Sequence, residues 1–489
     1  MPSAREYADA ETYLQGAFTP ELKEHDHGEL AVIEGELPRS LRGVFTRNSS
    51  NPKFDPPRPY HWFDGDGMIH AVEFEDGRAR YRNRWVRTKG LAADEAAGQA
   101  TRTGLLARPD LGHPEGPYKN TANTDLIVWQ NKLLALWWLG GGQAYALSLP
   151  ELATEGPWTP PGTMTAHAKV DPHGGDLVFI DYADARPPFL THGVLTAAGE
   201  LRRTPIELPG PRPQHDLMLT ERFSVLLDVS MFADPVALAQ GKVRMRFFPE
   251  VPTRVGLFDR RAASPGAPRW FELPPCYVYH FAAAWEARGQ DGREQVIIVV
   301  SRIRDPLMYD PQVGRTQRVV PHLAHLRLEP QLVRWTLDLE SGQAREELLD
   351  DALAEFPRID DRRVGRPPSA VYLSLFEEDE ILRFAGVRRV GLDANATVHG
   401  PVLDRHYPPG WTGGEVSVLP LDEGNEDEGE SLLATFVTED ATGRSELWLL
   451  RASTLEIAAR LAIPTHVPVG FHTRWVPGSQ LGPAPSGMR

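Results

Sequence analysis

The sequence of 489 residues is poor in cysteine and contains no long hydrophobic run. Its single thiol, Cys276, cannot form a disulfide within the chain, so a disulfide scaffold is excluded and a reducing compartment is expected. No stretch approaches the roughly 18 consecutive apolar residues of a membrane span. The polar N-terminal residues 1–16 also lack the apolar core of a signal peptide. These absences predict a cytoplasmic protein.

Basic residues are also in short supply. The chain has 52 Lys and Arg against 67 Asp and Glu, a formal net charge of −15. Nucleic-acid binding needs a clustered basic face, so we expect no nucleic-acid partner. No Gly- or Ser-rich linker divides the chain, and its length permits a large core. We therefore predict one domain over residues 1–489, with residues 1–26 as a peripheral N-terminal segment.

Helical periodicity is scarce, and 44 prolines and 43 glycines interrupt the chain. Between them lie short runs rich in β-branched and aromatic residues, which is typical of strands. A strand–turn–strand layout recurs at multiples of roughly 50 residues, the length of one four-stranded propeller blade. A set of β-sandwiches would give a similar pattern, but we predict an all-β, seven-bladed β-propeller. The clearest runs are GVFTRN, KLLALWW, DLVFIDY, FSVLLDV, EQVIIVVSRI, AVYLSLF, SLLATFV and SELWLLR.

The segment YHWFDGDGMIHAVEF at residues 60–74 has the composition of a metal loop. Its glycines do not match a calcium loop, which requires glycine at the sixth position and a carboxylate at the twelfth. We instead predict a tight hairpin in which Gly65 and Gly67 adopt positive φ. His70 follows on a strand and is expected to pack in the interior rather than bind a metal.

Four of the sixteen histidines stand in apolar, strand-like contexts: His167, His215, His280 and His472. Taken singly, each is more often a packed core histidine than a ligand. The separations of 48, 65 and 192 residues exclude a local zinc-finger site. They suit a propeller axis instead, since the inner strands of different blades can each direct one side chain toward the central channel.

Ordered motifs from about residue 27 to the C-terminal WVP resemble the carotenoid cleavage oxygenase family. The resemblance implies a seven-bladed propeller with a dome of loops and short helices over its top face. It also implies one Fe(II) per chain on the axis, held by His167, His215, His280 and His472. Four neutral imidazoles would leave two octahedral positions open. The matching segments are GVFTRNSSNP, WFDGDGMIHAV, VRTKG, KNTANT, TAHAKVDP, QHDLMLTERF, HFAAAWE, EFPRID, GGEVSVLP, TGRSELWLL and GFHTRWVP.

The resemblance extends to residues around the metal. Glu355 and Glu415 match glutamates that orient ligand histidines, although either alone would pass for an ordinary surface carboxylate. Thr124 matches a threonine beside an open iron position. Trp138 stands where the family usually has a third such glutamate, so we expect one histidine to use a carbonyl or water instead, and iron retention to be weaker. Ala283 replaces the usual asparagine after the third histidine.

The predicted reaction is oxidative cleavage of an alkene of a carotenoid or apocarotenoid by O2, giving two carbonyl products. Stilbene-cleaving relatives are expected to hold a phenol with a tyrosine and a lysine. Lys119 is present, but Leu91 occupies the tyrosine position and would leave a buried phenol without one partner. An apolar polyene is therefore favoured. Cleavage of a stilbenoid or phenylpropanoid alkene remains an alternative, as does an inactive propeller that only binds.

Carotenoids are nearly insoluble in water, which raises the question of delivery from a membrane. Residues 229–247 combine Met231, Phe232, Val236 and Leu238 with nearby cations. This composition is typical of peripheral membrane contact, with apolar side chains in the bilayer and cations at the headgroups. A segment that covers the substrate tunnel would look the same. The sequence leaves the oligomeric state open.

Overall fold

The computed structural model describes residues 13–481 with internal gaps. The residues outside the description within that range are 59, 106, 108–109, 111, 161, 184–185, 237–244, 263–265, 307–328, 378–381 and 425–427.

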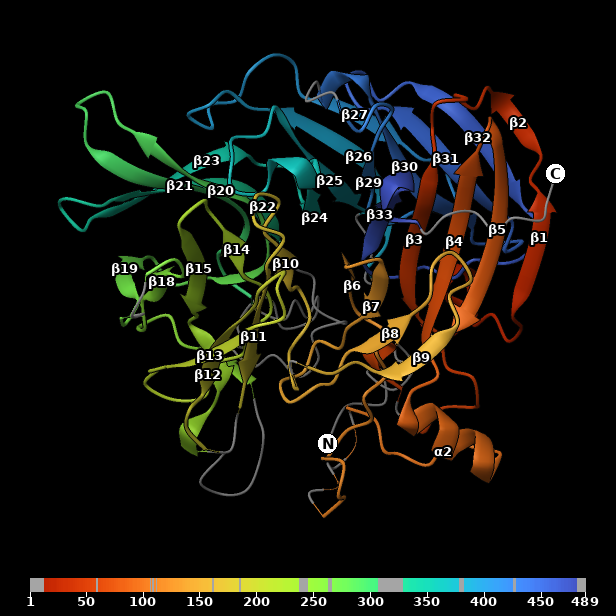
Figure 1. The fold of residues 1–489 in the computed structure, drawn as a ribbon, viewed down its shortest axis with the longest axis horizontal. Coiled ribbons are helices and arrows are strands. Elements are labelled where there is room, and N and C mark those ends of the chain that lie inside the picture. The colour runs from red at the N-terminus through yellow and green to blue at the C-terminus, as the bar shows by residue number, and fades with distance from the viewer. Residues whose placement is uncertain are drawn as a thin grey trace, which may run out of the picture. The chain divides into compact units, whose positions relative to one another are not determined.

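The sheet topology confirms the predicted seven-bladed β-propeller. Among the described residues the strands form seven sheets of four to six strands, and one additional two-stranded sheet. Neighbouring strands in these sheets pair antiparallel, for example β11 with β12 and β12 with β13. The chain divides into two compact units, one of residues 1–137, 142–162 and 405–489, the other of residues 138–141 and 163–404. Figure 1 shows the strands by label.

The first unit contains three of the seven sheets. In one of them β33, the last strand of the chain, pairs with β3 near the N-terminus, so distant segments share a blade. The first sheet holds β1 (His25–Glu29), β5 (Arg78–Trp85), β4 (Gly67–Glu75), β3 (Gly43–Ser50) and β33 (Thr473–Pro477). The second holds β6 (Leu126–Trp129), β7 (Lys132–Ala135), β8 (Tyr145–Leu147) and β9 (Thr154–Pro157). The third holds β2 (Val32–Gly35), β32 (Ile457–Ile463), β31 (Ser445–Arg451), β30 (Ser431–Glu439), β28 (Trp411–Thr412) and β29 (Ser417–Pro420).

The second unit contributes the other four blade sheets and the small hairpin. The blade sheets are β10 (Lys169–Val170), β11 (Leu177–Tyr182), β12 (Leu190–Leu195) and β13 (Leu201–Ile206); β14 (Met218–Leu219), β15 (Phe223–Asp228), β18 (Thr253–Asp259) and β19 (Arg269–Leu273); β20 (Tyr277–Arg288), β21 (Glu294–Ile303), β22 (Pro330–Asp338) and β23 (Ala344–Asp350); and β24 (Ala354–Arg358), β25 (Ala370–Phe376), β26 (Phe384–Gly391) and β27 (Leu403–His406). The hairpin pairs β16 (Met231–Ala233) with β17 (Met245–Phe247).

Helices are few and short in the part of the chain that the structure describes. The α-helix α2 (Lys89–Ala97) begins at Thr88, whose side chain accepts a hydrogen bond from the Leu91 amide, and ends at Gly98 in the left-handed region. The 3₁₀ turns are η1 (Gly16–Phe18), η2 (Trp62–Asp64), η4 (Asp361–Arg363), η5 (Glu428–Glu430) and η6 (Gly478–Gln480). Among the described residues we find no helix with the length and apolar character needed to cross a bilayer.

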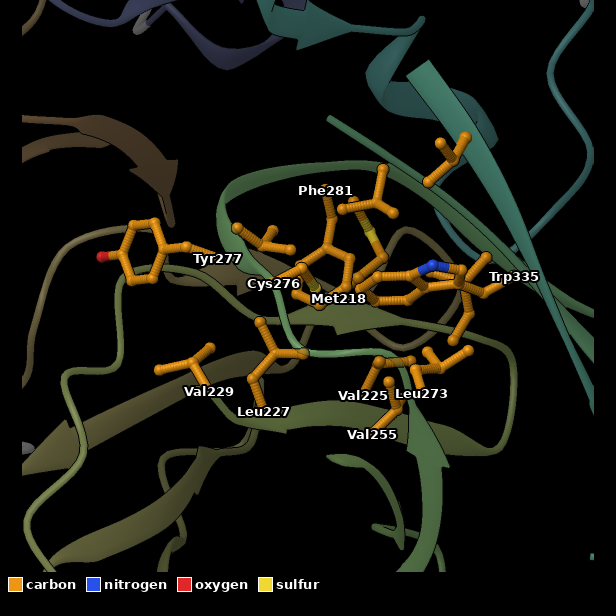
Figure 2. Close-up of a cluster of buried hydrophobic side chains, with 14 of the residues drawn as sticks. Met218, Val225, Leu227, Val229, Val255, Leu273, Cys276, Tyr277, Phe281 and Trp335 are labelled. Carbon is orange, nitrogen blue, oxygen red and sulfur yellow. The ribbon is translucent and has the colours of Figure 1, made fainter. Parts of the chain in front are cut away.

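Hydrophobic cores form where neighbouring sheets face each other. In the second unit, residues of β15, β18 and β19 pack against residues of β20 to β22, with Trp335 and Phe281 among the largest side chains (Figure 2). The single cysteine, Cys276, lies in this core, and burial raises the pKa of its thiol to about 12. Because the thiolate is the reactive form, Cys276 is a packing residue.

The N-terminal residues from Tyr13 onward are integrated into the first unit. Tyr13 stacks on Trp62 at a ring separation of 5.4 Å, and Phe18 meets the same ring edge-on at 5.3 Å. Strand β1 then pairs with β5. Residues 13–26 thus contact the first unit, and their assignment to a peripheral N-terminal segment stays a prediction. The single-domain assignment over 1–489 stays a prediction.

The turn at residues 64–67 differs from the predicted hairpin. Gly65 has a φ of −67° and does not adopt the left-handed conformation, and Gly67 begins strand β4. Glycine is required here by close approach. A Cβ on Gly65 would lie 2.5 Å from Ser50 Oγ, and one on Gly67 2.7 Å from the Ala122 carbonyl oxygen. The predicted positive φ was therefore wrong, since the constraint comes from distant chain segments.

The segment proposed for membrane contact is only partly exposed. Met231 and Phe232 are buried, and Phe232 stacks on Phe248 at 4.2 Å beneath the Arg212 guanidinium. Val236 is 67% exposed. Leu238 and two of the nearby cations, Lys242 and Arg244, lie outside the described residues. The apolar side chains of β16 thus pack within the protein.

Candidate metal centre

The four candidate histidines lie at the starts or irregular points of strands. His167 precedes β10 and has a φ of +65°, an unusual conformation for a residue with a Cβ. His215 precedes β14 and His472 precedes β33. His280 lies in β20 where the ladder with β21 is interrupted between Val278 and Phe281. Bulges of this kind redirect a side chain out of the regular alternation.

The structure brings the four histidines together. One ring nitrogen from each lies within 4.8 Å of the others, a group that could hold a metal ion. Nε2 of His215 and Nε2 of His280 are 3.2 Å apart. Two nitrogens bound to one ion at about 2.1 Å lie about 3 Å apart at right angles and about 4 Å apart on opposite sides. The 3.2 Å spacing of His215 and His280 therefore fits two neighbouring ligands of one ion, and neutral imidazoles suit a first-row transition metal.

Glu355 on β24 approaches His280. Its Oε2 lies 2.7 Å from Nδ1 of His280, and both side chains are buried. The next residue, Phe356, has a φ of +54°, and its amide donates to the same carboxylate. A buried carboxylate accepts a hydrogen bond from Nδ1–H and so keeps the proton on Nδ1, which leaves the lone pair on Nε2. This nitrogen is the one that faces His215.

Glu415 holds His472 in the same way and with more bonds. Its Oε1 lies 3.1 Å from Nδ1 of His472, while its Oε2 accepts from the amide and, at 3.0 Å, the hydroxyl of Thr473. The carbonyl of Thr124 accepts from the His472 amide at 3.4 Å, and the Thr124 hydroxyl donates to Asn123. Thr124 thus contacts the backbone of this histidine, and its place beside an open metal position stays a prediction.

Trp138 and Ala283, the two departures from the family pattern, have structural contacts of their own. The Trp138 carbonyl accepts a 2.6 Å hydrogen bond from Thr165, two residues before His167. Ala283 packs in the core formed with β21 and β25. Whether the tryptophan weakens metal retention stays a prediction.

Lys119 and Leu91, at the two positions where stilbene-cleaving relatives are expected to hold a phenol, make contacts within the protein. Leu91 is fully buried against Met68 and Trp85. The Lys119 ammonium lies 2.6 Å from Asp66 and 2.7 Å from Asp94. Desolvation lowers the pKa of Lys119, but the two carboxylates more than compensate, so that its pKa is raised overall.

Two residues, one that contacts the chain segment before His472 and one within it, were not identified from the sequence. Arg47 on β3 is fully buried; its guanidinium donates to the Pro468 carbonyl and lies 5.0 Å from the Phe436 ring centre. Burial lowers the pKa of Arg47 to about 9. Phe471, next to His472, packs on Trp62 at 4.4 Å. The motif TRNSSNP contains Arg47, but its spacing gave no indication of a contact more than 400 residues away in the chain.

Comparison with known proteins identifies the family. The profile described as "Retinal pigment epithelial membrane protein" matches residues 18–477. The chain is 31% identical over 507 residues to carotenoid 9,10(9',10')-cleavage dioxygenase 1 of Arabidopsis thaliana, covering 96% of this chain and 90% of the relative. It is also 31% identical over 528 residues to the carotenoid cleavage oxygenase of Mycobacterium tuberculosis, covering 98% and 100%. The chain belongs to the carotenoid cleavage oxygenase family.

Solved structures agree with this family assignment. The lignostilbene dioxygenase of Pseudomonas brassicacearum superposes with a TM-score of 0.81 at 25% identity, covering 95% of this chain and 98% of that one. A variant of the Synechocystis apocarotenoid oxygenase gives a TM-score of 0.79 at 25% identity, with 96% and 99% covered. The family and fold expected from the motifs are thereby confirmed.

Proposed function

We propose that this family member is an iron(II) dioxygenase that cleaves one alkene double bond of a carotenoid or apocarotenoid with O2, forming two carbonyl products. The observation that carries the proposal is the group of four histidine nitrogens within 4.8 Å of one another. His167, His215, His280 and His472 would hold the ion. Ferrous iron, when bound, would supply the activation of O2 that permits its addition across the double bond.

The protein residues prepare this site for a metal. Glu355 and Glu415 keep the Nδ1 protons of His280 and His472, so that both Nε2 lone pairs remain available. Phe356 lies 5.2 Å from the His280 ring, and Phe471 is the neighbour of His472. Apolar rings beside the ligands exclude water and suit a hydrocarbon better than a polar substrate.

The engaged lysine supports a polyene over a stilbenoid. Lys119 already makes two ion pairs in a largely buried position. A substrate phenol would have to compete with two carboxylates for one ammonium, in a place where a lost charge partner is costly. Leu91 offers no hydroxyl, and its side chain is fully packed.

Product analysis tests the reaction. Protein reconstituted with Fe(II) is incubated with ¹⁸O₂ and, in parallel, an apocarotenal or a hydroxystilbene. We expect cleavage of the apocarotenal into two carbonyl products that carry label, with O2 consumed. Label in neither product would refute dioxygen insertion. Faster cleavage of the hydroxystilbene would establish the stilbenoid alternative, and absence of both iron and oxygen consumption would indicate a binding module.

We also propose a cytoplasmic location with peripheral membrane contact at residues 229–247. Val236 is exposed, and Arg246 is 41% exposed at its side chain. Liposome flotation of Val236→Glu tests this contact, with Leu201→Glu as a control at another exposed apolar position. We expect weaker flotation only for the first variant. Equal flotation of both variants and the parent would refute the contact.

A further inference from the structure

Asp216, the residue after His215, is a buried carboxylate that receives several donors. Its Oδ1 accepts from the Leu217 amide at 2.8 Å, and its Oδ2 accepts from the Phe281 amide at 2.9 Å. Phe281 directly follows His280. One side chain therefore connects the backbone beside His215 to the backbone beside His280. The interrupted β20 ladder is the place where this connection occurs.

Lys169 connects the backbone of a third histidine, His167, to Asp216. Its Nζ lies 2.5 Å from Asp216 Oδ1 and 3.1 Å from the carbonyl oxygen of His167. The lysine side chain is 17% exposed and the aspartate side chain 3%. At such burial a charge pair is held firmly, and removal of one partner leaves an uncompensated buried charge. Both charges are thus matched within this small cluster.

The backbone at His167 makes such a contact necessary. A φ of +65° is unfavourable for a residue with a Cβ, and it persists only where the surroundings fix it. The Lys169 ammonium binds the carbonyl of this same residue. It therefore acts on the peptide group that sets the direction of the His167 ring.

We propose that Lys169 and Asp216 form a clasp that positions His167, His215 and His280 for metal binding. The clasp comprises the two side chains, the His167 carbonyl and the Phe281 amide. Neither side chain would touch the metal, so both are positioning residues. This inference rests on the proposed function, because it concerns the same ion.

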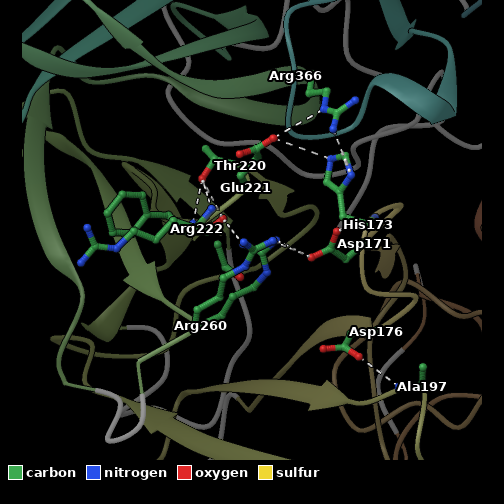
Figure 3. A network of polar contacts seen from close by, with 12 residues as sticks. Asp171, His173, Asp176, Ala197, Thr220, Glu221, Arg222, Arg260 and Arg366 are labelled. Carbon is green, nitrogen blue, oxygen red and sulfur yellow. Dashed lines mark hydrogen bonds and ion pairs between the residues drawn. The ribbon is translucent and has the colours of Figure 1, made fainter. Parts of the chain in front are cut away.

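A second set of polar contacts joins the same chain segments farther from the histidines. Figure 3 shows Arg260 contacting Asp171, with an Nη2 to Oδ2 distance of 2.8 Å. In the same network Glu286 of β20 accepts from the Thr220 hydroxyl at 2.7 Å and the Arg222 amide at 2.9 Å. Glu286 lies six residues after His280. Substitution of Glu286 by glutamine therefore provides a matched control, because it weakens contacts between the same segments without altering the clasp.

The experiment measures metal retention and does not depend on turnover. Parent protein and the variants Lys169→Met, Asp216→Asn, Lys169→Arg and Glu286→Gln are loaded with Fe(II), and iron loss to an excess of a coloured chelator is followed. Removal of groups that orient metal ligands typically costs 10- to 100-fold in affinity. We expect iron loss at least about tenfold faster for K169M and D216N, and within about twofold of the parent for E286Q. K169R should restore most of the retention.

Two further measurements separate positioning from general stability. The visible spectrum of the Co(II)-loaded protein should change in K169M and D216N but not in E286Q, because it reports the ligand arrangement. The hydrogen-exchange rate of the Phe281 amide should rise in metal-free D216N, because this amide donates to Asp216. This measurement remains informative if K169M does not fold.

Each outcome decides the inference. Parental iron retention in K169M or D216N would overturn the clasp, as would loss in E286Q as fast as in those variants. A parent protein that retains no iron would overturn the proposed function and the clasp with it. A parent that retains iron while the clasp variants behave like it would overturn the clasp alone.

Discussion

Substitution of Glu415 by glutamine should weaken metal binding by His472 while the protein still folds. The carboxylate accepts from three donors, namely Nδ1 of His472 and the amide and hydroxyl of Thr473. Glutamine has one carbonyl oxygen and one NH2 group in place of two acceptor oxygens. If its oxygen faces Thr473, its NH2 faces Nδ1 of His472, and the ring must move its proton to Nε2. A protonated Nε2 cannot bind a metal.

The magnitude follows from the burial of this contact. Glu415 is 3% exposed, so water cannot replace a lost bond. A buried donor left unsatisfied costs about 1–3 kcal/mol of unfolding free energy. Loss of an orienting carboxylate lowers metal affinity by about 10- to 100-fold. We therefore expect E415Q to fold, to unfold at lower urea concentration, and to bind Fe(II) at least about tenfold more weakly.

A second buried glutamate separates the two effects. Glu446 is 2% exposed and accepts from Trp448 Nε1 at 2.8 Å and Arg460 Nη2 at 2.7 Å, with no candidate ligand among these partners. E446Q should lose comparable stability with unchanged iron affinity. The assay is equilibrium competition for Fe(II) with a coloured chelator, alongside urea unfolding. Parental iron affinity in E415Q, or an equal loss in E446Q, would refute the tautomer argument.

Three further substitutions test buried charges and packing in the first unit. Burial raises the pKa of Asp64 from 3.8 to about 7, so the folded chain keeps a proton that the unfolded chain releases, and stability should fall as pH rises from about 4 to about 7. Asp64→Asn should remove about 3 kcal/mol of this fall between pH 5 and pH 8, measured by urea unfolding at both pH values; an unchanged pH profile would contradict the assignment. Lys119→Met leaves two buried carboxylates without their cation, so unfolding free energy should drop by about 3–5 kcal/mol and recover partly at acidic pH; a pH-independent effect would argue against the ion pairs. Trp62→Ala should cost about 3–5 kcal/mol and speed proteolysis of the N-terminal segment, because the ring is 1% exposed and packs on Phe471; parental protease resistance would speak against this packing.

Several structural features were predictable because they depend on local chain chemistry. Short runs of β-branched and aromatic residues between glycines and prolines specify strands, and their recurrence indicated blades. His70 was expected in the interior, and it is fully buried between Ser49 and Tyr81. Glu355 and Glu415, in contrast, were singled out only by the resemblance of EFPRID and GGEVSVLP to the family, and each contacts a candidate histidine.

Other features were not predictable because they depend on what a distant segment presents. Gly65 and Gly67 need space next to Ser50 and Ala122, although their backbones are not left-handed. Phe232 appeared suited to a membrane, but Phe248 and Arg212 cover its ring. In both cases the type of the residue was known, but its surroundings could not be read from the neighbouring sequence.

By itself, the amino-acid order determined an all-β propeller and the four histidines that a metal would need, since strand propensity and residue chemistry are properties of the side chains. Only the tertiary structure decided how those histidines are held. The clasp joins Lys169 and Asp216 to a carbonyl and an amide, groups that nearly every residue possesses and that no motif can mark. Their partners become specific only when folding brings segments dozens of residues apart within hydrogen-bond distance.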